Sequence, residues 1–396
     1  MRFPLLPIII ILIVNAAIDL YIYCALHSYC RKRLWPRIQA WSAVACAAAL
    51  IVAICLPKRG GSDDCLRAAM WILYAYFSVY VPKILFLVGD VCSRIPCIWD
   101  KHRWQWMSWV GFGVGCVFFL AMWWGALVNR FSIDVNEVDI EVAGLPRGFD
   151  GFTIAQISDL HVGTYGNDPD FLEDLVAGVN ALNPDMIVFT GDIVNRHSQE
   201  LIPFVDVLSE LKAPCGVYSI MGNHDYGDYC DWDTPEQKQA DIRALQKMQA
   251  QMGWQMLNNA HDWIHWRGDS IVLIGVENVG DPPFHTYGDL KIAYPTIGDR
   301  HTKILLSHNP AHWDLDIQDN RGSNIALTLS GHTHAMQMEL FGWSPSMWRY
   351  EHWGGLYADD HGQKLYVNIG AGEVAFPARI GATPEITLFT LKSSQK

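Results

Sequence analysis

Five short motifs between residues 159 and 334 contain side chains of the types that bind metal ions. They are Asp159-Leu160-His161, Gly191-Asp192, Gly222-Asn223-His224-Asp225, Ser307-His308-Asn309 and Gly331-His332-Thr333-His334. Carboxylate and amide oxygens combined with imidazole nitrogens suit a pair of divalent metals, and such a pair activates water for hydrolysis. The motifs therefore predict a metal-dependent hydrolase.

The spacing inside the motifs supports a shared site. Asp159 and His161 are two residues apart, so on an extended strand end their side chains point to the same side. The same holds for His332 and His334, and Gly331 before them permits a close backbone approach. Each motif alone has a plainer explanation, such as a turn, a helix cap or a lone strand-end histidine. Five of them, each after an apolar run, favour a metal site.

Apolar, β-rich runs precede the motifs and alternate with helical stretches. The predicted strands are 152–158, 186–190, 216–221, 270–276, 302–306, 325–329, 365–369 and 385–391, and the predicted helices are 168–182, 201–211 and 236–252. Strands that alternate with helices, followed by strand-rich sequence, indicate an α/β layered fold. Ligands in such folds bind at the carboxyl ends of strands, where all five motifs fall.

The order of the five motifs resembles that of the calcineurin-like metallophosphoesterase superfamily, over about residues 135–392. The segments Tyr366–Gly370 and Pro384–Leu391, with Arg379 between them, resemble its membrane-anchored bacterial branch. Ala335 and Met336 stand where relatives often have Gly-Gly, a departure that leaves the ligands untouched. The resemblance implies a β-sandwich flanked by helices, in the αββα arrangement of the family.

The resemblance also implies a role for each polar residue. Two metal ions, of Mn, Fe or Zn, would activate a bridging hydroxide that attacks a phosphoester. His224 would protonate the leaving oxygen, and Asp225 would orient His224. The implied metal ligands are Asp159, His161 and His334 at one ion, Asn223, His308 and His332 at the other, and Asp192 between both.

Residues 1–130 are predicted to be a membrane anchor, and residues 131–396 the catalytic domain. The stretches 5–26, 38–56, 66–88 and 107–128 are apolar, and each has roughly the 20 residues needed to cross the hydrocarbon core. The first begins like a signal peptide, but its apolar character continues and three more spans follow, which indicates an uncleaved anchor. Asp19 and Lys83 lie within spans. We expect them to pair while Lys83 reaches toward the headgroups, the alternative being a polar pathway.

Charge differs between the two parts and sets the predicted orientation. Residues 1–130 have 13 Lys and Arg against 5 Asp and Glu, whereas residues 131–396 have 16 against 36. The acidic catalytic part argues against a nucleic-acid partner. Basic residues are cytoplasmic by preference, so the two loops richest in them place the catalytic domain in the periplasm or outside a bacterial cell. Those loops contain Arg31, Lys32, Arg33 and Arg37, and Arg94, Lys101 and Arg103.

The two cysteines of the catalytic part, Cys215 and Cys230, are the candidates for a disulfide if that part lies outside the cytoplasm. Whether they pair depends on their separation in space, which the sequence does not give.

A segment rich in aromatic residues and methionine follows the last motif. It either packs as ordinary core or forms an apolar lip that admits a lipid-bearing phosphoester at the membrane surface. Distant relatives in the superfamily cleave a pyrophosphate in lipid A synthesis, but that reaction is cytoplasmic and conflicts with the predicted orientation. The residues concerned are Met336, Met338, Leu340, Phe341, Trp343, Met347, Trp348, Tyr350 and Trp353.

The predicted function is hydrolysis of a phosphomonoester, phosphodiester or pyrophosphate at the membrane, with lipid-linked substrates as candidates. Two other classes of function stay open. A non-catalytic phosphoester-binding scaffold or sensor would keep the fold, although the complete ligand set argues against it. A transporter or channel would need more polar residues within the membrane than Asp19 and Lys83. The oligomeric state is not predicted.

Overall fold

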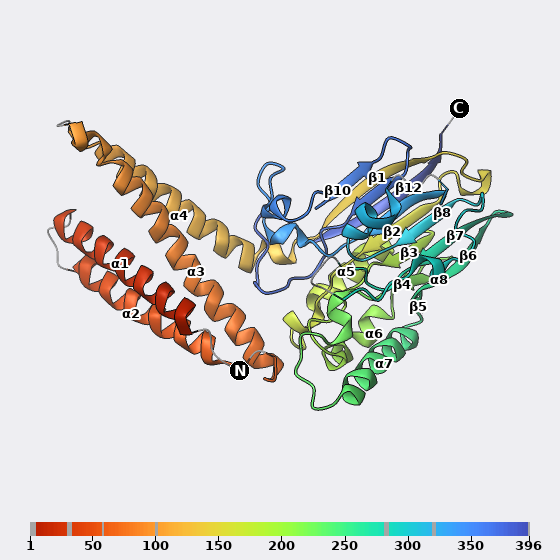
Figure 1. Cartoon of the computed structure of the whole chain (residues 1–396), viewed down its shortest axis with the longest axis horizontal. Helices are drawn as coiled ribbons and strands as arrows, with labels where there is room; N and C mark the ends of the chain where they lie inside the picture. The colour runs from red at the N-terminus through yellow and green to blue at the C-terminus, as the bar shows by residue number, and fades with distance from the viewer. Residues whose placement is uncertain are drawn as a thin grey trace. The chain divides into compact units, whose positions relative to one another are not determined.

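The computed structural model describes residues 5–29, 34–57, 59–99, 102–280, 285–318 and 322–394 (Figure 1). The chain forms two compact units, Met1–Ala126 with Ala375–Pro377, and Leu127–Val374 with Ala378–Lys396. Several basic residues on which the predicted orientation depends, Arg31, Lys32, Arg33 and Lys101, lie outside the described residues. The orientation therefore stays a prediction.

The first unit contains four long apolar helices, α1 (Leu5–Tyr29), α2 (Leu34–Cys55), α3 (Asp63–Cys92) and α4 (Gln105–Leu127). Each is long and apolar enough to cross a membrane, which confirms the four predicted spans. Helices in lipid associate closely where small residues face each other. Gly89 of α3 and Gly111 of α4 meet in this way, because a Cβ atom built on Gly89 would lie 2.8 Å from the Cα atom of Gly111.

Asp19 and Lys83 form an ion pair inside the bundle, as the sequence predicted. Lys83 Nζ lies 2.8 Å from Asp19 Oδ1, and Asp19 also accepts hydrogen bonds from Tyr80 and Gln39 at 2.7 and 2.8 Å. The Lys83 ammonium also lies 3.4 Å from Ser42 Oγ, eight residues after the start of α2 at Leu34. That Lys83 reaches toward the headgroups stays a prediction.

The second unit contains two six-stranded sheets. One has the order β1-β12-β2-β3-β4-β5 and the other β10-β11-β9-β8-β7-β6. The eight predicted strands are present, and each of their ends lies within two residues of the predicted one. The strands of the first sheet are β1 (Asp134–Val142), β12 (Glu385–Ser393), β2 (Thr153–Ile157), β3 (Met186–Phe189), β4 (Val217–Ser219) and β5 (Gln255–Met256). Those of the second are β10 (Gly355–Ala358), β11 (Lys364–Val367), β9 (Ile325–Ser330), β8 (Lys303–Leu306), β7 (Asp269–Gly275) and β6 (Ala260–Trp266).

The centre of each sheet is parallel. Strands β2 to β5 run parallel in one sheet, as do β7, β8, β9 and β11 in the other. Such strands are buried on both faces, which explains why the sequence shows them as continuous apolar runs. Parallel neighbours also end at the same edge, so residues that follow β2, β3 and β4 come together, and so do residues that follow β8 and β9.

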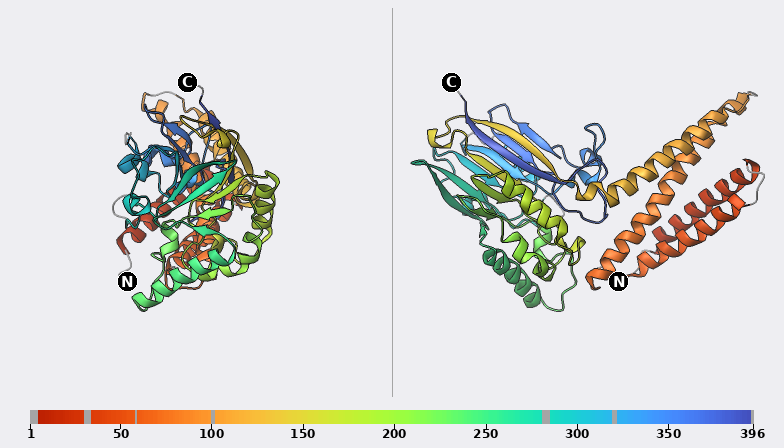
Figure 2. Two further views of the ribbon diagram at one scale, coloured as in Figure 1. Left: turned by 90° about the vertical axis from the view of Figure 1, so that its right-hand side faces the viewer. Right: turned by 180° about the vertical axis from the view of Figure 1, so that it is seen from behind.

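The two sheets pack face to face, and helices cover their outer faces (Figures 1 and 2). Ile154 and Val188 of the first sheet share a core with Leu273 and Leu306 of the second. On the outside of the first sheet lie α5 (Asp170–Ala181), α6 (Val205–Leu208) and α7 (Pro235–Gln251). On the outside of the second lie α8 (Leu290–Ala293) and the turn that contains Trp313. This arrangement confirms the predicted αββα sandwich.

One predicted helix differs from the structure. The stretch 201–211 forms a 3₁₀ helix, Ser198–Phe204, followed by the short α6. Pro203 lies inside the 3₁₀ segment and cannot donate an intrahelical hydrogen bond, so a regular α-helix cannot run through it.

Candidate metal centre

The five motifs follow the carboxyl ends of β2, β3, β4, β8 and β9. The two sheets therefore supply the site jointly, three motifs from one and two from the other. All seven predicted ligands come together there. They are Asp159, His161, Asp192, Asn223, His308, His332 and His334.

One group consists of Asp159, His161 and His334. His334 Nε2 lies 3.3 Å from Asp159 Oδ1 and 3.0 Å from His161 Nε2. His161 Nε2 lies 3.7 Å from Asp192 Oδ2, so Asp192 borders this group. Asp159 and His161 are completely buried.

A second group surrounds His308. Its Nε2 atom lies 3.1 Å from Asp192 Oδ2, 3.1 Å from Asn223 Oδ1 and 3.3 Å from His332 Nδ1. Asp192 Oδ2 thus faces both groups, which is the position expected of a bridging carboxylate. One ligand atom from each of Asp192, His308 and His332 lies within 4.8 Å of the others.

The donor set fits divalent cations. Ring nitrogens of His161 and His334 face each other at 3.0 Å, a distance at which two lone pairs need a cation or a proton between them. Oxygen and imidazole donors of this kind suit Mn, Fe or Zn. His161 Nδ1 is buried without a hydrogen-bond partner among the described residues, so the polar contacts of this ring are all made by Nε2.

Two family models match the chain. "Probable Calcineurin-like phosphoesterase, transmembrane domain" matches residues 1–130, and "Calcineurin-like phosphoesterase" matches residues 152–336. The Bacillus subtilis (strain 168) protein "Uncharacterized metallophosphoesterase YkuE" is 32% identical over 274 residues, which are 66% of this chain and 86% of that protein. The chain belongs to the calcineurin-like metallophosphoesterase family. It is a metal-dependent phosphoester hydrolase and an integral membrane protein.

Two further relatives extend the comparison. The Danio rerio "Transmembrane protein with metallophosphoesterase domain" is 30% identical over 272 residues, 66% of this chain and 57% of that protein, so the chain spans little more than half its length. The Chlamydia muridarum (strain MoPn / Nigg) protein "UDP-2,3-diacylglucosamine pyrophosphatase LpxG" is 29% identical over 233 residues, 50% of this chain and 68% of that protein.

Charges in the metallophosphoesterase site suit metal binding. Burial acts to raise the pKa of Asp192, but the imidazoles of His308 and His224 outweigh it and hold the pKa well below its usual range. Burial and the nearby His308 lower the pKa of His332 to about 3, and burial above all lowers that of His161. These shifts favour an ionised Asp192 and neutral His161 and His332, the forms that bind metal, whereas Asp192 raises the pKa of His308 to about 9 despite burial.

Backbone strain is concentrated in the same loops. Five of the seven predicted ligands have positive φ, although none is a glycine: Asp159, His161, Asp192, His332 and His334 have φ of 54°, 44°, 62°, 74° and 51°. Each such residue costs of order 1–3 kcal/mol and persists only where the surrounding structure holds it. Strain of this kind is typical of functional sites.

Gly331 allows the second sheet to approach the first. A Cβ atom at this position would lie 2.0 Å from Ser158 Oγ and 2.3 Å from Asp159 Oδ2. Any side chain here would therefore push the loop that contains His332 and His334 away from Asp159.

Partners outside the predicted set orient the ligands. His308 Nδ1 donates to the carbonyl of Thr190 at 2.8 Å, which leaves Nε2 to face the site. Asn223 Nδ2 donates to the hydroxyl of Tyr229 at 3.0 Å, so the amide oxygen faces His308. Sequence reasoning missed the role of Tyr229, because a tyrosine six residues after a ligand carries no distinctive signal. Such partners fix ring and amide orientation.

His224 lies beside the first group, and its surroundings differ from those expected. A ligand atom of its ring lies within 4.8 Å of those of His161 and Asp192. Its Nδ1 atom is 2.7 Å from the carbonyl of Asn195, which requires the Nδ1–H form, and the ring stacks on Tyr229 with centroids 4.1 Å apart. Asn195, and not Asp225, is thus the hydrogen-bond partner that orients this imidazole.

Asp225 holds the loop backbone instead. Its Oδ2 accepts from the amides of Asp192 and Gly222, each at 2.9 Å, and its Oδ1 from Ile193 at 3.0 Å and Val194 at 3.3 Å. The expected orienting role is wrong because Asn223–Tyr226 forms a 3₁₀ turn, in which consecutive side chains point in different directions. Asp225 joins the loop of Asp192 to the loop that begins at Gly222.

Arg379 contacts the other side of the site. It is fully buried, and its guanidinium donates to the carbonyls of Ile369, Gly372 and Ala382 and lies 3.3 Å from His334 Nδ1. It therefore fixes the loop after β11 against a predicted metal ligand.

The segment after His334 is largely exposed, which excludes the expectation that its apolar residues form ordinary core. Tyr350, near its end, joins it to the site, since the hydroxyl lies 2.9 Å from His332 Nε2. The exposed residues, called here the apolar segment, are Met336, Leu340, Phe341, Trp343, Met347 and Trp348, with 47, 62, 99, 41, 49 and 80% of their surface accessible.

Among the described residues, Cys215 and Cys230 are not joined by a disulfide.

Proposed function

We propose that this metallophosphoesterase hydrolyses a lipid-linked phosphoester at two divalent ions, one held by Asp159, His161 and His334 and the other by Asn223, His308 and His332, with Asp192 between them. The observation that supports a lipid-linked substrate is the apolar segment, which is exposed and is joined to a predicted metal ligand through Tyr350. Monoester, diester and pyrophosphate substrates share this chemistry.

Two divalent ions supply a Lewis acid for the phosphoryl oxygens and lower the pKa of a bound water. The chain's own residues provide the proton chemistry. The Nδ1–H of His224 is fixed by the carbonyl of Asn195, so Nε2 is the atom that can carry a proton to the leaving oxygen. Stacking on Tyr229 holds the ring plane, and Asp192 stays ionised between the two ligand groups.

The apolar segment supports a substrate with hydrocarbon chains. A continuous exposed apolar surface beside a catalytic site marks a binding region more often than a random surface. Aromatic and aliphatic side chains of this kind bind at the boundary between headgroups and acyl chains. A relative whose name assigns it a diacylglucosamine-linked pyrophosphate is consistent with this substrate class.

A direct test compares two substrates of the full chain in detergent with Mn²⁺: a soluble chromogenic phosphodiester, and a phospholipid in mixed micelles. Phe341→Ser with Trp348→Ser should lower kcat/KM for the phospholipid and leave the soluble substrate unchanged. Ile292→Ser, which removes an exposed apolar side chain outside the segment, is the matched control. Equal loss on both substrates would show that the segment only supports the fold.

Catalysis itself separates the enzyme from a phosphoester-binding scaffold. His224→Ala should abolish hydrolysis of the soluble substrate while leaving the metal ligands intact, and Asp192→Asn should abolish both hydrolysis and metal binding. Unchanged rates in both variants would contradict the site assignment.

We further propose that the catalytic domain lies in the periplasm or outside a bacterial cell. The basic loops after the first and third spans support this orientation. A reporter fused after Lys396 that is active only in the cytoplasm would reverse the proposal, and would make a cytoplasmic lipid pyrophosphate the better candidate substrate.

A further inference from the structure

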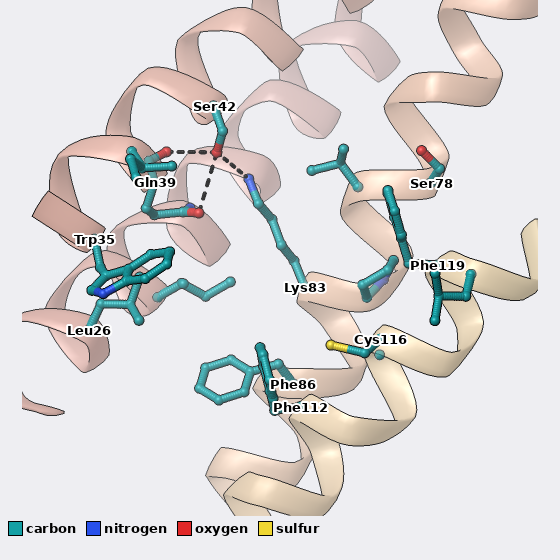
Figure 3. A pocket seen from close by; sticks show the side chains of 16 residues that line it. Leu26, Trp35, Gln39, Ser42, Ser78, Lys83, Phe86, Phe112, Cys116 and Phe119 are labelled. Atoms are coloured by element: carbon teal, nitrogen blue, oxygen red, sulfur yellow. Dashed lines mark hydrogen bonds between the residues drawn. The ribbon is translucent and has the colours of Figure 1, made fainter. Parts of the chain in front are cut away.

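A cavity of about 580 Å³ lies among the four helices of the membrane anchor (Figure 3). Its volume falls within the range of roughly 300–1,000 Å³ that is typical of small-molecule sites. Every helix contributes to its wall, with Leu26 from α1, Trp35 from α2, Phe86 from α3 and Phe119 from α4. Most of the lining is apolar, as a hydrocarbon chain requires.

One wall of the cavity is polar. Gln39, Ser42 and Lys83 line it, and Figure 3 shows the Lys83 side chain extended toward Ser42. The Lys83 ammonium has three N–H donors, of which Asp19 and Ser42 take two. Within the described part of the chain no oxygen or nitrogen acceptor takes the third, and the nearest aromatic ring, that of Tyr80, has its centroid 4.8 Å from Nζ. Ionisable groups inside a membrane are costly and mark ligand sites more often than chance.

A second polar group comes from a helix irregularity. Pro82 lies inside α3 and also lines the cavity. Because proline has no amide hydrogen, the carbonyl of Ser78, four residues earlier, lacks its regular intrahelical donor. Ser78 lines the same cavity. Backbone irregularities of this kind are tolerated in membranes where other groups can satisfy the freed carbonyl.

We propose that this cavity binds a glycerolipid of the bilayer, with an ester carbonyl oxygen accepting the third N–H of Lys83 and an acyl chain packed against Phe86, Phe112 and Phe119. Lys83 and Asp19 neutralise each other at 2.8 Å, so the site favours a neutral oxygen over a phosphate. Ser42 and Ser78 also line this cavity. This site is separate from the phosphoesterase centre and does not depend on the identity of its substrate.

The first test is occupancy. The full chain is placed in phosphatidylglycerol nanodiscs that contain a phosphatidylglycerol with a diazirine in its acyl chain, and labelled peptides are mapped by mass spectrometry. Cys116→Trp fills the cavity from α4, whereas Val117→Trp, the neighbouring residue, is 67% exposed and does not line it. We expect saturable labelling of peptides around Phe112 and Ser42 that Cys116→Trp removes and Val117→Trp retains.

Hydrolysis of the soluble substrate shows that each variant is folded. If Cys116→Trp does not fold, Leu120→Trp replaces it as the variant that fills the cavity. Equal labelling in the filling and control variants, or labelling that never saturates, would mean that only surrounding lipid is detected and would overturn the proposal.

The second test concerns the carbonyl. Unlabelled diester phosphatidylglycerol should compete about three- to ten-fold better than its diether analogue, which is the effect of one net hydrogen bond. The double variant Asp19→Asn with Lys83→Met removes both charges together and should abolish this preference. Equal competition by ester and ether lipids in the native protein would contradict the role of Lys83.

Discussion

Replacing Asp225 by asparagine tests whether this residue organises the loops or takes part in proton transfer. Its carboxylate is 1% exposed and accepts four backbone amides, two on each oxygen. An asparagine keeps one oxygen and places an NH₂ group against two N–H donors. Burial and the nearby Asp192 raise the pKa of Asp225 to about 7, so the carboxyl is ionised above that pH. Hydrogen bonds to a charged group contribute about 1.5–3 kcal/mol each, so losing two of them there costs about 3–6 kcal/mol.

The expected result is a large loss of stability together with a loss of metal affinity. A folded domain is stable by only about 5–15 kcal/mol, so the change should be visible as a clear fall in the unfolding temperature of the full chain in detergent. Hydrolysis of the soluble substrate should need more Mn²⁺, because Asp192 and the loop after Gly222 both lose their support. Hydrogen exchange should accelerate at the amides of Asp192, Ile193 and Gly222.

Asp206→Asn is the matched control, because Asp206 is exposed on α6 and its replacement should change stability by no more than about 0.5 kcal/mol. The reasoning is refuted if Asp225→Asn unfolds at the native temperature, exchanges slowly and keeps its Mn²⁺ requirement. A variant that is stable and saturated with metal but slow would instead return Asp225 to a role in catalysis.

Three further outcomes follow from the site. Tyr229→Phe removes the acceptor of Asn223 Nδ2, so the Mn²⁺ concentration for half-maximal hydrolysis should rise about 10–100-fold, and an unchanged value would exclude this support. Chelation should abolish hydrolysis, and excess Mn²⁺ should restore it. At a hundred times Kd, Mn²⁺ should increase the free energy of unfolding by about 2.7 kcal/mol and so raise the unfolding temperature; no shift would mean that the ions do not bind the folded site. Burial raises the pKa of Glu373 from 4.5 to about 7 despite its ion pair with Arg130, so folding favours the protonated carboxyl. The contribution of Glu373 to the free energy of unfolding should therefore be full below pH 4.5 and fall by up to about 3 kcal/mol as the pH rises through 7. This decline, measured by unfolding at several pH values, should be absent in Glu373→Gln.

The sequence predicts the centre of the fold better than its edges. Parallel strands such as β3 and β8 are buried on both faces, so their apolar runs are visible in the sequence. Strands β1, β5, β6 and β10 were not predicted. The N-terminal half of β1 is exposed and rich in acidic residues, β5 has two residues, and β6 mixes His, Asp and Trp without regular alternation. Such strands form through pairing with neighbours, which the local sequence does not encode.

The candidate ligands were predictable because each directly follows a strand, whereas their supports were not. Tyr229, Asn195 and Arg379 reach the site from loops and contact Asn223, His224 and His334, which are 6, 29 and 45 residues away in the sequence. Asp225 lies within a predicted motif, yet its function depends on the direction of one side chain in a 3₁₀ turn. Position in the sequence indicated where it lies, and only the structure shows what it binds.

The buried carboxylate of Asp225 supports the strained backbone at Asp192, one of the predicted ligands. Positive φ at Asp192 carries a cost, and the amide of that residue is held by Asp225 at 2.9 Å. Protein hydrogen bonds therefore help to hold the backbone conformation of this loop. A carboxylate fixed in this way would keep its position when substrate and product exchange, as the proposed pair of ions acting on one phosphoryl group would require.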